Sequence, residues 1–275
     1  MAKTRRLISD SLKVVDVVIE LVDARLPLSS RNPEIDRIVG KRPRILVLNK
    51  SDIADPNANS AWLDFFRKKG ITAMLADSLS GNGIIKNLDV AVETVLKDKF
   101  EREEQKGIKR RAVRMLIVGI PNVGKSSFIN RLSGRAAAKT GDRPGVTTAK
   151  QWIRLAGKYE LLDTPGILWP KFDDPEAAKR IAYTGGIKDE IMDIEELAFY
   201  LIGFLRSNYK ELLLSRFKIS EDIEDLDDFD VLELIGKKRG CIVSGGRVDS
   251  FRAATLVLDE FRSAKIGRIT LEMPD

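Results

Sequence analysis

The sequence contains no histidine, a single cysteine and no long apolar run. The absence of histidine excludes the usual histidine-based catalytic triads, proton transfer by imidazole and histidine zinc sites. The lone Cys241 excludes an internal disulfide framework and fits a reducing compartment, so we expect a cytoplasmic protein. No apolar stretch approaches the roughly 18 residues of a membrane helix. Ser9–Ser11 interrupts any signal-peptide core behind the basic N-terminus.

The charge is unevenly distributed along the 275 residues. Residues 1–175 hold 32 Lys and Arg against 21 Asp and Glu, whereas residues 176–275 hold 15 against 20. A basic front half suits a polyanion partner such as nucleic acid, and an ordinary solvated surface explains the charge equally well. With 43% hydrophobic residues, the chain is able to bury a core in one large or two modest domains.

Apolar spacing predicts strands that alternate with helices in the first part of the chain. The predicted strands cover residues 14–22, 44–48, 71–76, 113–118, 151–155 and 159–162, and the predicted helices cover residues 1–13, 33–39, 58–69, 84–105 and 126–132. This alternation is typical of an α/β domain with a mostly parallel sheet and helices on both faces. From about residue 176 only helical spacing remains, which indicates a small all-α domain. We place the domains at residues 1–174 and 175–275.

Residues Gly119–Ser126 read GIPNVGKS, which fits the phosphate-loop pattern of two spaced glycines followed by Lys and Ser. Glycines let main-chain N–H groups curl around phosphate oxygens, and the following helix adds the positive end of its dipole. Lys125 is then expected to reach the β- and γ-phosphates, and the Ser126 hydroxyl to bind Mg²⁺. A glycine-rich turn is the alternative, but the strand and helix on either side favour a phosphate loop.

Asn49–Asp52 reads NKSD and follows a predicted buried strand. Asp52 offers two acceptor oxygens to the N1–H and the exocyclic amine of guanine, a donor pair that adenine lacks. We expect Asn49 to brace the neighbouring loops and the Lys50 stem to lie over the base plane. Ser78, at the next strand end, is expected to touch the guanine edge through nearby main-chain N–H groups. A strand-end turn with an Asx cap, and a plain helix-entry loop at Ser78, are the alternatives.

Two further loops are expected beside the phosphates. Asp163–Gly166 reads DTPG; Asp163 would hold Mg²⁺ through water, and the Gly166 N–H would meet the γ-phosphate. Arg143–Thr148 reads RPGVTT and supplies a hydroxyl that completes the Mg²⁺ shell. We favour Thr147 for this role, with Thr148 as the alternative.

The base-reading loops precede the phosphate loop, whereas in Ras-like GTPases the phosphate loop comes first. In one parallel sheet all these loops follow the carboxyl ends of strands, so they still converge on one nucleotide. Such a permutation is possible because domain termini often lie close together. The charged stretch over residues 84–111 would then join the original ends.

This motif order resembles the circularly permuted GTPases, and within them the bacterial ribosome-biogenesis GTPase A (YlqF) group. Further similar stretches are Asp23–Arg25, Ser29–Pro33, Arg143–Thr148, Gly245–Asp249 and Phe261–Ser263. The resemblance covers essentially the whole chain, and implies a circularly permuted Ras-like P-loop GTPase domain followed by a small helical domain. It also implies GTP hydrolysis to GDP and phosphate, coupled to late assembly of the large (50S) ribosomal subunit, with its precursor and ribosomal RNA as partners.

Two positions depart from the Ras-like pattern. Ile167 follows the DTPG motif where Ras-like enzymes carry a water-orienting glutamine, and the resemblance implies a histidine from an N-terminal Pro-Gly-His segment instead. This chain starts at Met1–Lys3, which resembles the residues after that histidine; either the true start lies upstream or GTP is hydrolysed in another way. Family analogy also suggests that Asn122 holds a K⁺ ion, whose charge stabilises the transition state without an arginine finger. A loop-shaping asparagine is the alternative.

The second domain carries charges of both signs. The acid-rich run from Glu221 to Glu233 would be repelled by RNA and is expected to be a solvated connection or a contact to basic protein. Basic residues that are expected to be exposed and to suit phosphate contact follow it: Lys237, Lys238, Arg239, Arg247, Arg252, Arg262, Lys265 and Arg268. Solubilising charge around a helical bundle is the alternative. Because Gly166 leads into this domain, we expect γ-phosphate sensing to re-aim it on the ribosome.

We therefore predict a GTPase switch in ribosome assembly, with slow intrinsic hydrolysis that the ribosomal particle stimulates. A GTP-dependent RNA-binding module with negligible hydrolysis is the alternative, followed by a P-loop kinase, which would not need the NKSD motif. The predicted nucleotide-binding residues are Asn49, Lys50, Asp52, Ser78, Asn122, Val123, Gly124, Lys125, Ser126, Ser127 and Gly166; the catalytic ones are Lys125, Thr147 and Gly166; the Mg²⁺ ligands are Ser126, Thr147 and Asp163; the K⁺ ligand is Asn122. We expect a monomer that binds GTP or GDP with Mg²⁺, and neither DNA nor a membrane.

Overall fold

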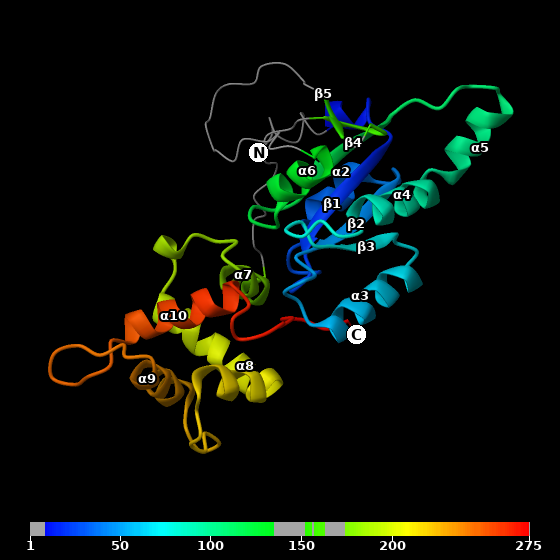
Figure 1. Ribbon diagram of the computed structural model, residues 1–275. Coiled ribbons are helices and arrows are strands. Elements are labelled where there is room, and N and C mark those ends of the chain that lie inside the picture. The colour runs from blue at the N-terminus through cyan, green and yellow to red at the C-terminus, as the bar shows by residue number, and fades with distance from the viewer. Residues whose placement is uncertain (1–8, 135–151, 156, 163–173, 275) are drawn as a thin grey trace. The chain divides into compact units, whose positions relative to one another are not determined.

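The computed structural model describes residues 9–134, 152–155, 157–162 and 174–274 (Figure 1). The chain forms two compact units, Met1–Phe172 with Thr270–Asp275, and Asp173–Ile269. The last six residues therefore belong to the first unit, whereas the sequence analysis assigned them to the helical domain. The physical reason is burial, since Thr270 and Leu271 are only 2% and 3% exposed.

The first unit is built on a sheet whose strands lie in the order β3-β2-β1-β4-β6-β5 in the described residues. The strands are β1 (Val17–Asp23), β2 (Arg44–Asn49), β3 (Ala73–Ala76), β4 (Val113–Val118), β5 (Trp152–Leu155) and β6 (Tyr159–Leu162). Every neighbouring pair is parallel except β5 and β6, which are antiparallel. This confirms the predicted mostly parallel sheet. All seven residues of β1 are buried, including Glu20 and Asp23, as expected for a mostly apolar strand at the centre of such a sheet.

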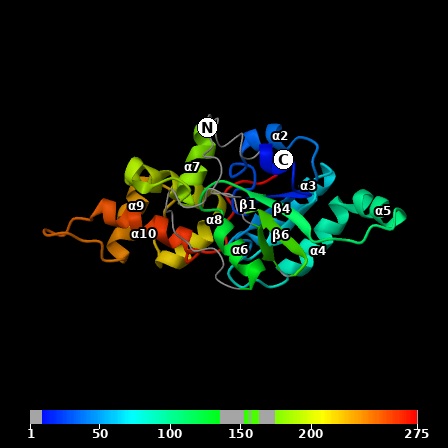
Figure 2. The same ribbon diagram turned by 90° about the horizontal axis from the view of Figure 1, so that it is seen from above.

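Helices cover both faces of this sheet. Figure 2 shows α2 (Pro33–Val39) and α3 (Pro56–Lys68) on one side, and α4 (Ile84–Val95) and α6 (Lys125–Ser133) on the other. Val18 of β1 packs in a cluster with α2, and Val22 packs in a second cluster with Trp62 and Phe66 of α3. Residues of one parity along β1 thus face α2 and α3, because side chains alternate along a strand.

The predicted single helix over residues 84–105 is wrong. The structure has two helices there, α4 and α5 (Lys97–Gln105), with a break at Leu96, whose φ of −106° and ψ of 10° lie outside the helical range. Leu96 and Phe100 are both buried, although charged residues surround them in the sequence. The mostly apolar residues before Leu96 and the charged residues after it therefore form separate helices.

The second unit is helical in the described residues. Its α-helices are α7 (Pro175–Tyr183), α8 (Ile194–Phe217), α9 (Asp228–Lys238) and α10 (Ser250–Arg262), with a short 3₁₀ helix, η1 (Asp189–Ile191), after α7. The apolar side chains that recur at helical spacing, such as Leu201 on α8 and Leu258 on α10, are buried, and α8 packs against both α9 and α10. This confirms the predicted helical domain. In the part of the chain that is described, no helix is both long and apolar enough to cross a membrane.

Candidate nucleotide-binding site

Among the described residues, the NKSD loop, the Ser78 loop and the phosphate loop all follow the carboxyl ends of strands in the sheet. In the strand register, Asp23 of β1 lies beside Asn49 of β2, which lies beside Ala76 of β3. On the other side of β1, Val118 at the end of β4 pairs with Glu20. Because all four strands are parallel, the segments after them emerge together at their carboxyl ends, where α/β sheets bind ligands.

The phosphate loop joins β4 to α6. Asn122 and Gly124 adopt positive φ angles of 63° and 91°, and Gly124 caps α6. As the N-cap residue, Gly124 has no side chain with which to cap the first N–H groups of this helix, and these groups lie at the end of the helix that adjoins the loop. A Cβ atom at Gly119 would lie 2.5 Å from the Leu21 carbonyl oxygen, so the entry to the loop requires glycine. The loop therefore has the form of an anion-binding cradle.

Lys125 is the first residue of α6 and its ammonium group folds back over the loop. Its Nζ donates hydrogen bonds to the carbonyl oxygens of Gly119 at 2.9 Å and Ile120 at 2.7 Å. Burial lowers the pKa of Lys125 to about 8. A cation that is partly desolvated and held by neutral carbonyls is suited to binding anionic phosphates, which would restore its charged state.

Asn49 connects three of the motif loops. Its Nδ2 donates to the Val123 carbonyl of the phosphate loop at 2.7 Å, and its Oδ1 accepts from Ser78 Oγ, also at 2.7 Å. A Cβ atom at Gly124 would lie 2.4 Å from Asn49 Nδ2, so glycine is required for this close approach. The structure thus brings Asn49, Ser78 and the phosphate loop together, although they are far apart in the sequence.

The loop after β3 is also held by α6. Arg131 donates through Nε to the Ser78 carbonyl at 3.4 Å and through Nη2 to the Leu79 carbonyl. Asp77 accepts from the main-chain N–H groups of Leu79 and Ser80, which closes the same loop into a turn. Sequence reasoning did not assign Arg131 a role, because an arginine on a helix carries no signal that its partners are carbonyls 53 and 52 residues earlier.

The side chain of Lys50 is anchored by a buried carboxylate. Its Nζ lies 3.0 Å from Asp23 Oδ2, and Arg25 binds the same carboxylate through Nε at 3.0 Å and Nη2 at 2.9 Å. Burial opposes ionisation of Asp23, but the charges of Arg25 and Lys50 and the hydrogen bonds from Arg25 hold the pKa of its carboxyl well below its usual range. The sequence analysis noted Asp23–Arg25 only as a similar stretch and missed this role.

Asp52 lies half-buried in the turn after β2. The Ser51 N–H donates to the Ala76 carbonyl at 3.1 Å, and Asn59 Nδ2 donates to the Ser51 carbonyl at 3.0 Å. These hydrogen bonds tie the turn after β2 to strand β3 and to helix α3. Asp52, the predicted base reader, therefore belongs to a hydrogen-bonded turn that begins next to Asn49.

The remaining predicted residues divide into two groups. Asn122, Ser126 and Ser127 are exposed on the phosphate loop and the first turn of α6. Thr147 with its alternative Thr148, Asp163, Gly166 and Ile167 lie outside the described residues.

Two of the basic residues predicted to face RNA are only partly exposed and bind partners within the unit. Arg262 donates to the carbonyls of Tyr183 and Ala182 and pairs with Asp189 at 2.7 Å. Arg239 pairs with Glu260 at 3.3 Å. The expectation of exposure was wrong for both, because these guanidinium groups join helices within the unit. The others among the predicted residues that are exposed are Lys237, Lys238, Arg247, Arg252, Lys265 and Arg268.

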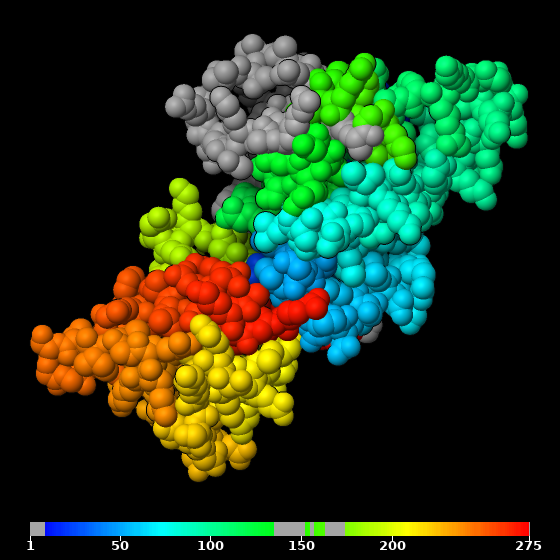
Figure 3. Space-filling view, viewed as in Figure 1, coloured from blue at the N-terminus to red at the C-terminus, as the bar shows by residue number. Residues whose placement is uncertain are grey.

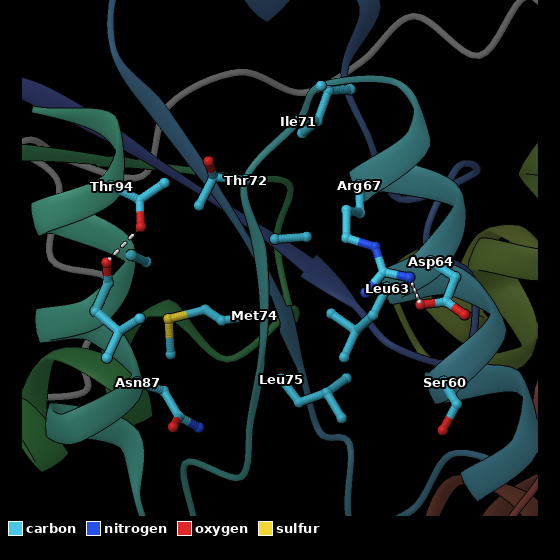
Figure 4. A pocket seen from close by; sticks show the side chains of 14 residues that line it. Ser60, Leu63, Asp64, Arg67, Ile71, Thr72, Met74, Leu75, Asn87 and Thr94 are labelled. Atoms are coloured by element: carbon cyan, nitrogen blue, oxygen red, sulfur yellow. Dashed lines mark hydrogen bonds and ion pairs between the residues drawn. The ribbon is translucent and has the colours of Figure 1, made fainter. Parts of the chain in front are cut away.

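A cavity of about 830 Å³ lies between α3 and α4 along the outer strand β3 (Figure 4). Arg67 and Leu63 approach it from α3, and Thr94 and Asn87 approach it from α4, with Met74 and Leu75 of β3 between them. None of the predicted nucleotide-binding residues lines it. The candidate site is accordingly the loop edge and not this cavity.

A parallel sheet with a phosphate loop after β4, and an NKSD loop that comes earlier in the chain yet bonds to it, defines a circularly permuted P-loop GTPase. Residues 114–233 match the family described as 50S ribosome-binding GTPase. Proteins named ribosome biogenesis GTPase A from Bacillus cereus and Priestia megaterium are each 49% identical over 100% of this chain, which covers 92% and 94% of their lengths. The chain belongs to the ribosome biogenesis GTPase A family, whose members take part in ribosome assembly, and it is a GTP hydrolase.

Solved structures agree with this assignment. The GDP-bound structure of TM YlqF matches with a TM-score of 0.68 at 28% identity, covering 98% of this chain and 99% of that one. The GNP-bound YlqF from Thermotoga maritima matches with a TM-score of 0.67 at 27% identity, covering 99% of each chain. Both likenesses extend over the GTPase unit and the helical unit.

Proposed function

We propose that this GTPase is a switch in the late assembly of the large (50S) ribosomal subunit, and that GTP binds where the NKSD loop, Ser78 and the phosphate loop meet. The proposed nucleotide site rests on the Asn49 side chain, which forms hydrogen bonds with the Val123 carbonyl and with Ser78 and so joins the three loops. The two solved relatives are GDP-bound and GNP-bound, which supports a guanine nucleotide here.

Each predicted residue is then proposed to have one role. Lys125 and the N–H groups of residues 123–127 bind the phosphates, and Ser126 holds Mg²⁺ together with Thr147 and Asp163. The magnesium ion neutralises charge on the phosphates during phosphoryl transfer. Asp52 reads the guanine N1–H and exocyclic amine, while the Lys50 stem and Ser78 flank the base. Gly166 senses the γ-phosphate.

Asn122 is proposed to hold K⁺ beside the phosphates. It is exposed and its φ of 63° turns the phosphate loop sharply at this residue. A monovalent cation there would add positive charge next to the transferred phosphoryl group, a task that an arginine finger performs in other GTPases.

The helical unit is proposed to contact ribosomal RNA through the loop between α9 and α10. Arg247 is exposed in this loop, and Arg252 and the 60% exposed Phe251 lie next to it on the first turn of α10. Exposed arginines bind phosphates, and an exposed aromatic ring offers a face on which an unpaired base stacks. A partner of this kind places the protein in the cytoplasm, where we propose that it works as a monomer without binding DNA.

GTP turnover tests the proposal. We expect slow hydrolysis by the protein alone, faster hydrolysis with large ribosomal subunits, and a higher rate in K⁺ than in Na⁺. Phe251→Ala with Arg247→Ala should lose the stimulation and keep the basal rate, while Lys188→Ala, an exposed control in the same unit, should keep both. If GTP is not hydrolysed in any condition, the alternative of a GTP-dependent RNA-binding module holds instead. If large subunits still stimulate the double variant, this surface is not the RNA contact.

A further inference from the structure

The residues after the helical unit return to the GTPase unit and are bonded into it. The Leu271 N–H donates to the Arg25 carbonyl at 2.7 Å, and the indole N–H of Trp62 donates to the Glu272 carbonyl at 3.0 Å. Figures 1 and 3 show this segment (red) reaching α3. Because Thr270 and Leu271 are almost fully buried, the segment 270–272, called here the tail, is part of the folded unit.

The Glu272 carboxylate holds the loop that follows β1. It accepts hydrogen bonds from the Leu28 N–H, from the Ser29 N–H at 3.0 Å and from the Ser29 hydroxyl at 2.6 Å. Hydrogen bonds to an ionised acceptor are stronger than those between neutral groups. The bonds to Glu272 and the bond from Leu271 to Arg25 together fix the segment Arg25–Ser29.

Side-chain contacts connect that segment to the base-reading loop. Arg25 binds the Asp23 carboxylate, and Asp23 binds Lys50 of the NKSD motif at 3.0 Å. Asp23 and Arg25 are both only 3% exposed in their side chains, so water offers little screening of this pair. The position of Lys50 therefore depends on a loop that the tail holds.

The tail also holds the other end of the base-reading loop. The hydroxyl oxygen of Thr270 accepts from the Asp55 N–H at 3.1 Å, and Asp55 caps the first N–H groups of α3. Asp55 stands three residues after Asp52 in the sequence. The tail thus contacts Arg25, which is linked to Lys50 through Asp23, and Asp55, which follows Asp52 in the chain.

We infer that the tail is a positioning segment for guanine recognition, acting on Lys50 through Arg25 and Asp23 and on Asp52 through Asp55. The inference rests on the proposed role of the NKSD loop as the base reader. Loss of the tail contacts should weaken the part of the affinity that comes from the base, and leave the part that comes from the phosphates.

The test compares the dissociation constants of GDP and IDP, since IDP lacks only the exocyclic amine that Asp52 is expected to bind. For Glu272→Ala we expect the preference for GDP over IDP to fall about tenfold, with a smaller fall in IDP affinity because IDP keeps the N1–H that Asp52 also binds. Glu272→Gln, which keeps one acceptor oxygen, should show an intermediate loss and serves if Glu272→Ala does not fold. Met273→Ala, which changes the exposed neighbouring residue, should keep the wild-type preference.

The outcomes separate the tail from the base reader. A preference that is lost in Asp52→Asn but stays within about twofold of wild type in both Glu272 variants, even with a lowered melting temperature, would show that the tail is only structural. A wild-type protein without preference, or an unchanged preference in Asp52→Asn, would instead remove the NKSD loop as the base reader and the inference with it.

Discussion

The side-chain nitrogen of Asn49 lies 2.7 Å from the carbonyl oxygen of Val123 and donates a hydrogen bond to it. Asn49 is 1% exposed, and its carbonyl oxygen accepts a second hydrogen bond from Ser78. One buried amide therefore holds the end of β2, the phosphate loop and the loop after β3 in a fixed arrangement. The permuted order of the motifs does not disturb this arrangement, because the sheet and not the chain order sets which loops meet.

Asn49→Ala should destabilise the protein and weaken nucleotide binding. It leaves the Val123 carbonyl and the Ser78 hydroxyl without this partner, and each buried polar group left unsatisfied costs about 1–3 kcal/mol. We expect the free energy of unfolding in urea to fall by about 2–4 kcal/mol, and GDP affinity to fall with it. Asn87→Ala, at an exposed asparagine on α4, should stay within about 0.5 kcal/mol of wild type. Equal effects of the two variants would refute the bridging role.

Lys125→Met should change how stability depends on pH. Burial lowers the pKa of Lys125 to about 8 from 10.5, so between those values the folded protein binds fewer protons than the unfolded chain. The stability of the nucleotide-free protein therefore rises with pH across this window. The variant should lose that rise and should be more stable near pH 7 by roughly 3 kcal/mol, while GDP binding is lost. Urea unfolding at several pH values measures this.

Lys86→Met provides the control, because Lys86 is exposed. It should leave both the pH dependence and GDP binding as in wild type. If Lys125→Met follows the wild-type pH dependence, or still binds GDP with wild-type affinity, the ammonium group is neither buried against the loop nor a phosphate ligand.

Asp23→Asn should leave Arg25 buried without its counter-charge. Removing one partner of a buried pair costs about 3–5 kcal/mol, so we expect a loss of that size in the free energy of unfolding at pH 7. Because the folded pKa of Asp23 is depressed, the ionised pair stabilises the protein above the unfolded value near 3.8 and loses this effect as the pH falls further. The deficit of the variant should accordingly shrink below about pH 4.

Asp64→Asn is the matched control for this prediction. Asp64 pairs with Arg67 on the surface of α3, where its side chain is 57% exposed, and surface pairs contribute about 0–1 kcal/mol. Chemical unfolding of both variants from pH 3 to 7 gives the comparison. A deficit for Asp23→Asn no larger than that of the control would contradict the buried pair.

Patterns within a short stretch of sequence predicted much of the fold. The nearly continuous apolar runs predicted β1, β2 and β4 within three residues, since strands buried on both faces are mostly apolar. The sequence analysis expected Asn49 to brace neighbouring loops, because two loops that follow parallel strands lie at the same end of the sheet. The hydrogen bond from Asn49 to the Val123 carbonyl matches that expectation. Which residues bind the nucleotide stays a prediction.

Contacts between distant residues could not be predicted in the same way. The pairing of Lys50 with Asp23 and of Glu272 with Ser29 depends on which loop side chains meet, and neither has a periodic signal. The break at Leu96 was hidden because apolar residues keep helical spacing before it and helix-favouring charged residues follow it. Arg262 was expected to be exposed since a basic residue at a helix end usually is, but carbonyls and Asp189 surround it.

The affinity of Asp52→Asn for guanine and xanthine nucleotides tests the central claim most directly, since it asks whether the loop after β2 reads the base of a nucleotide whose phosphates lie on the loop after β4. An asparagine amide matches the xanthine 2-oxo group and no longer accepts both guanine donors. Titration with GDP and XDP should show wild type preferring GDP and the variant preferring XDP, with Asn57→Asp, an exposed change on α3, keeping the GDP preference. A variant that still selects GDP over XDP would contradict the account.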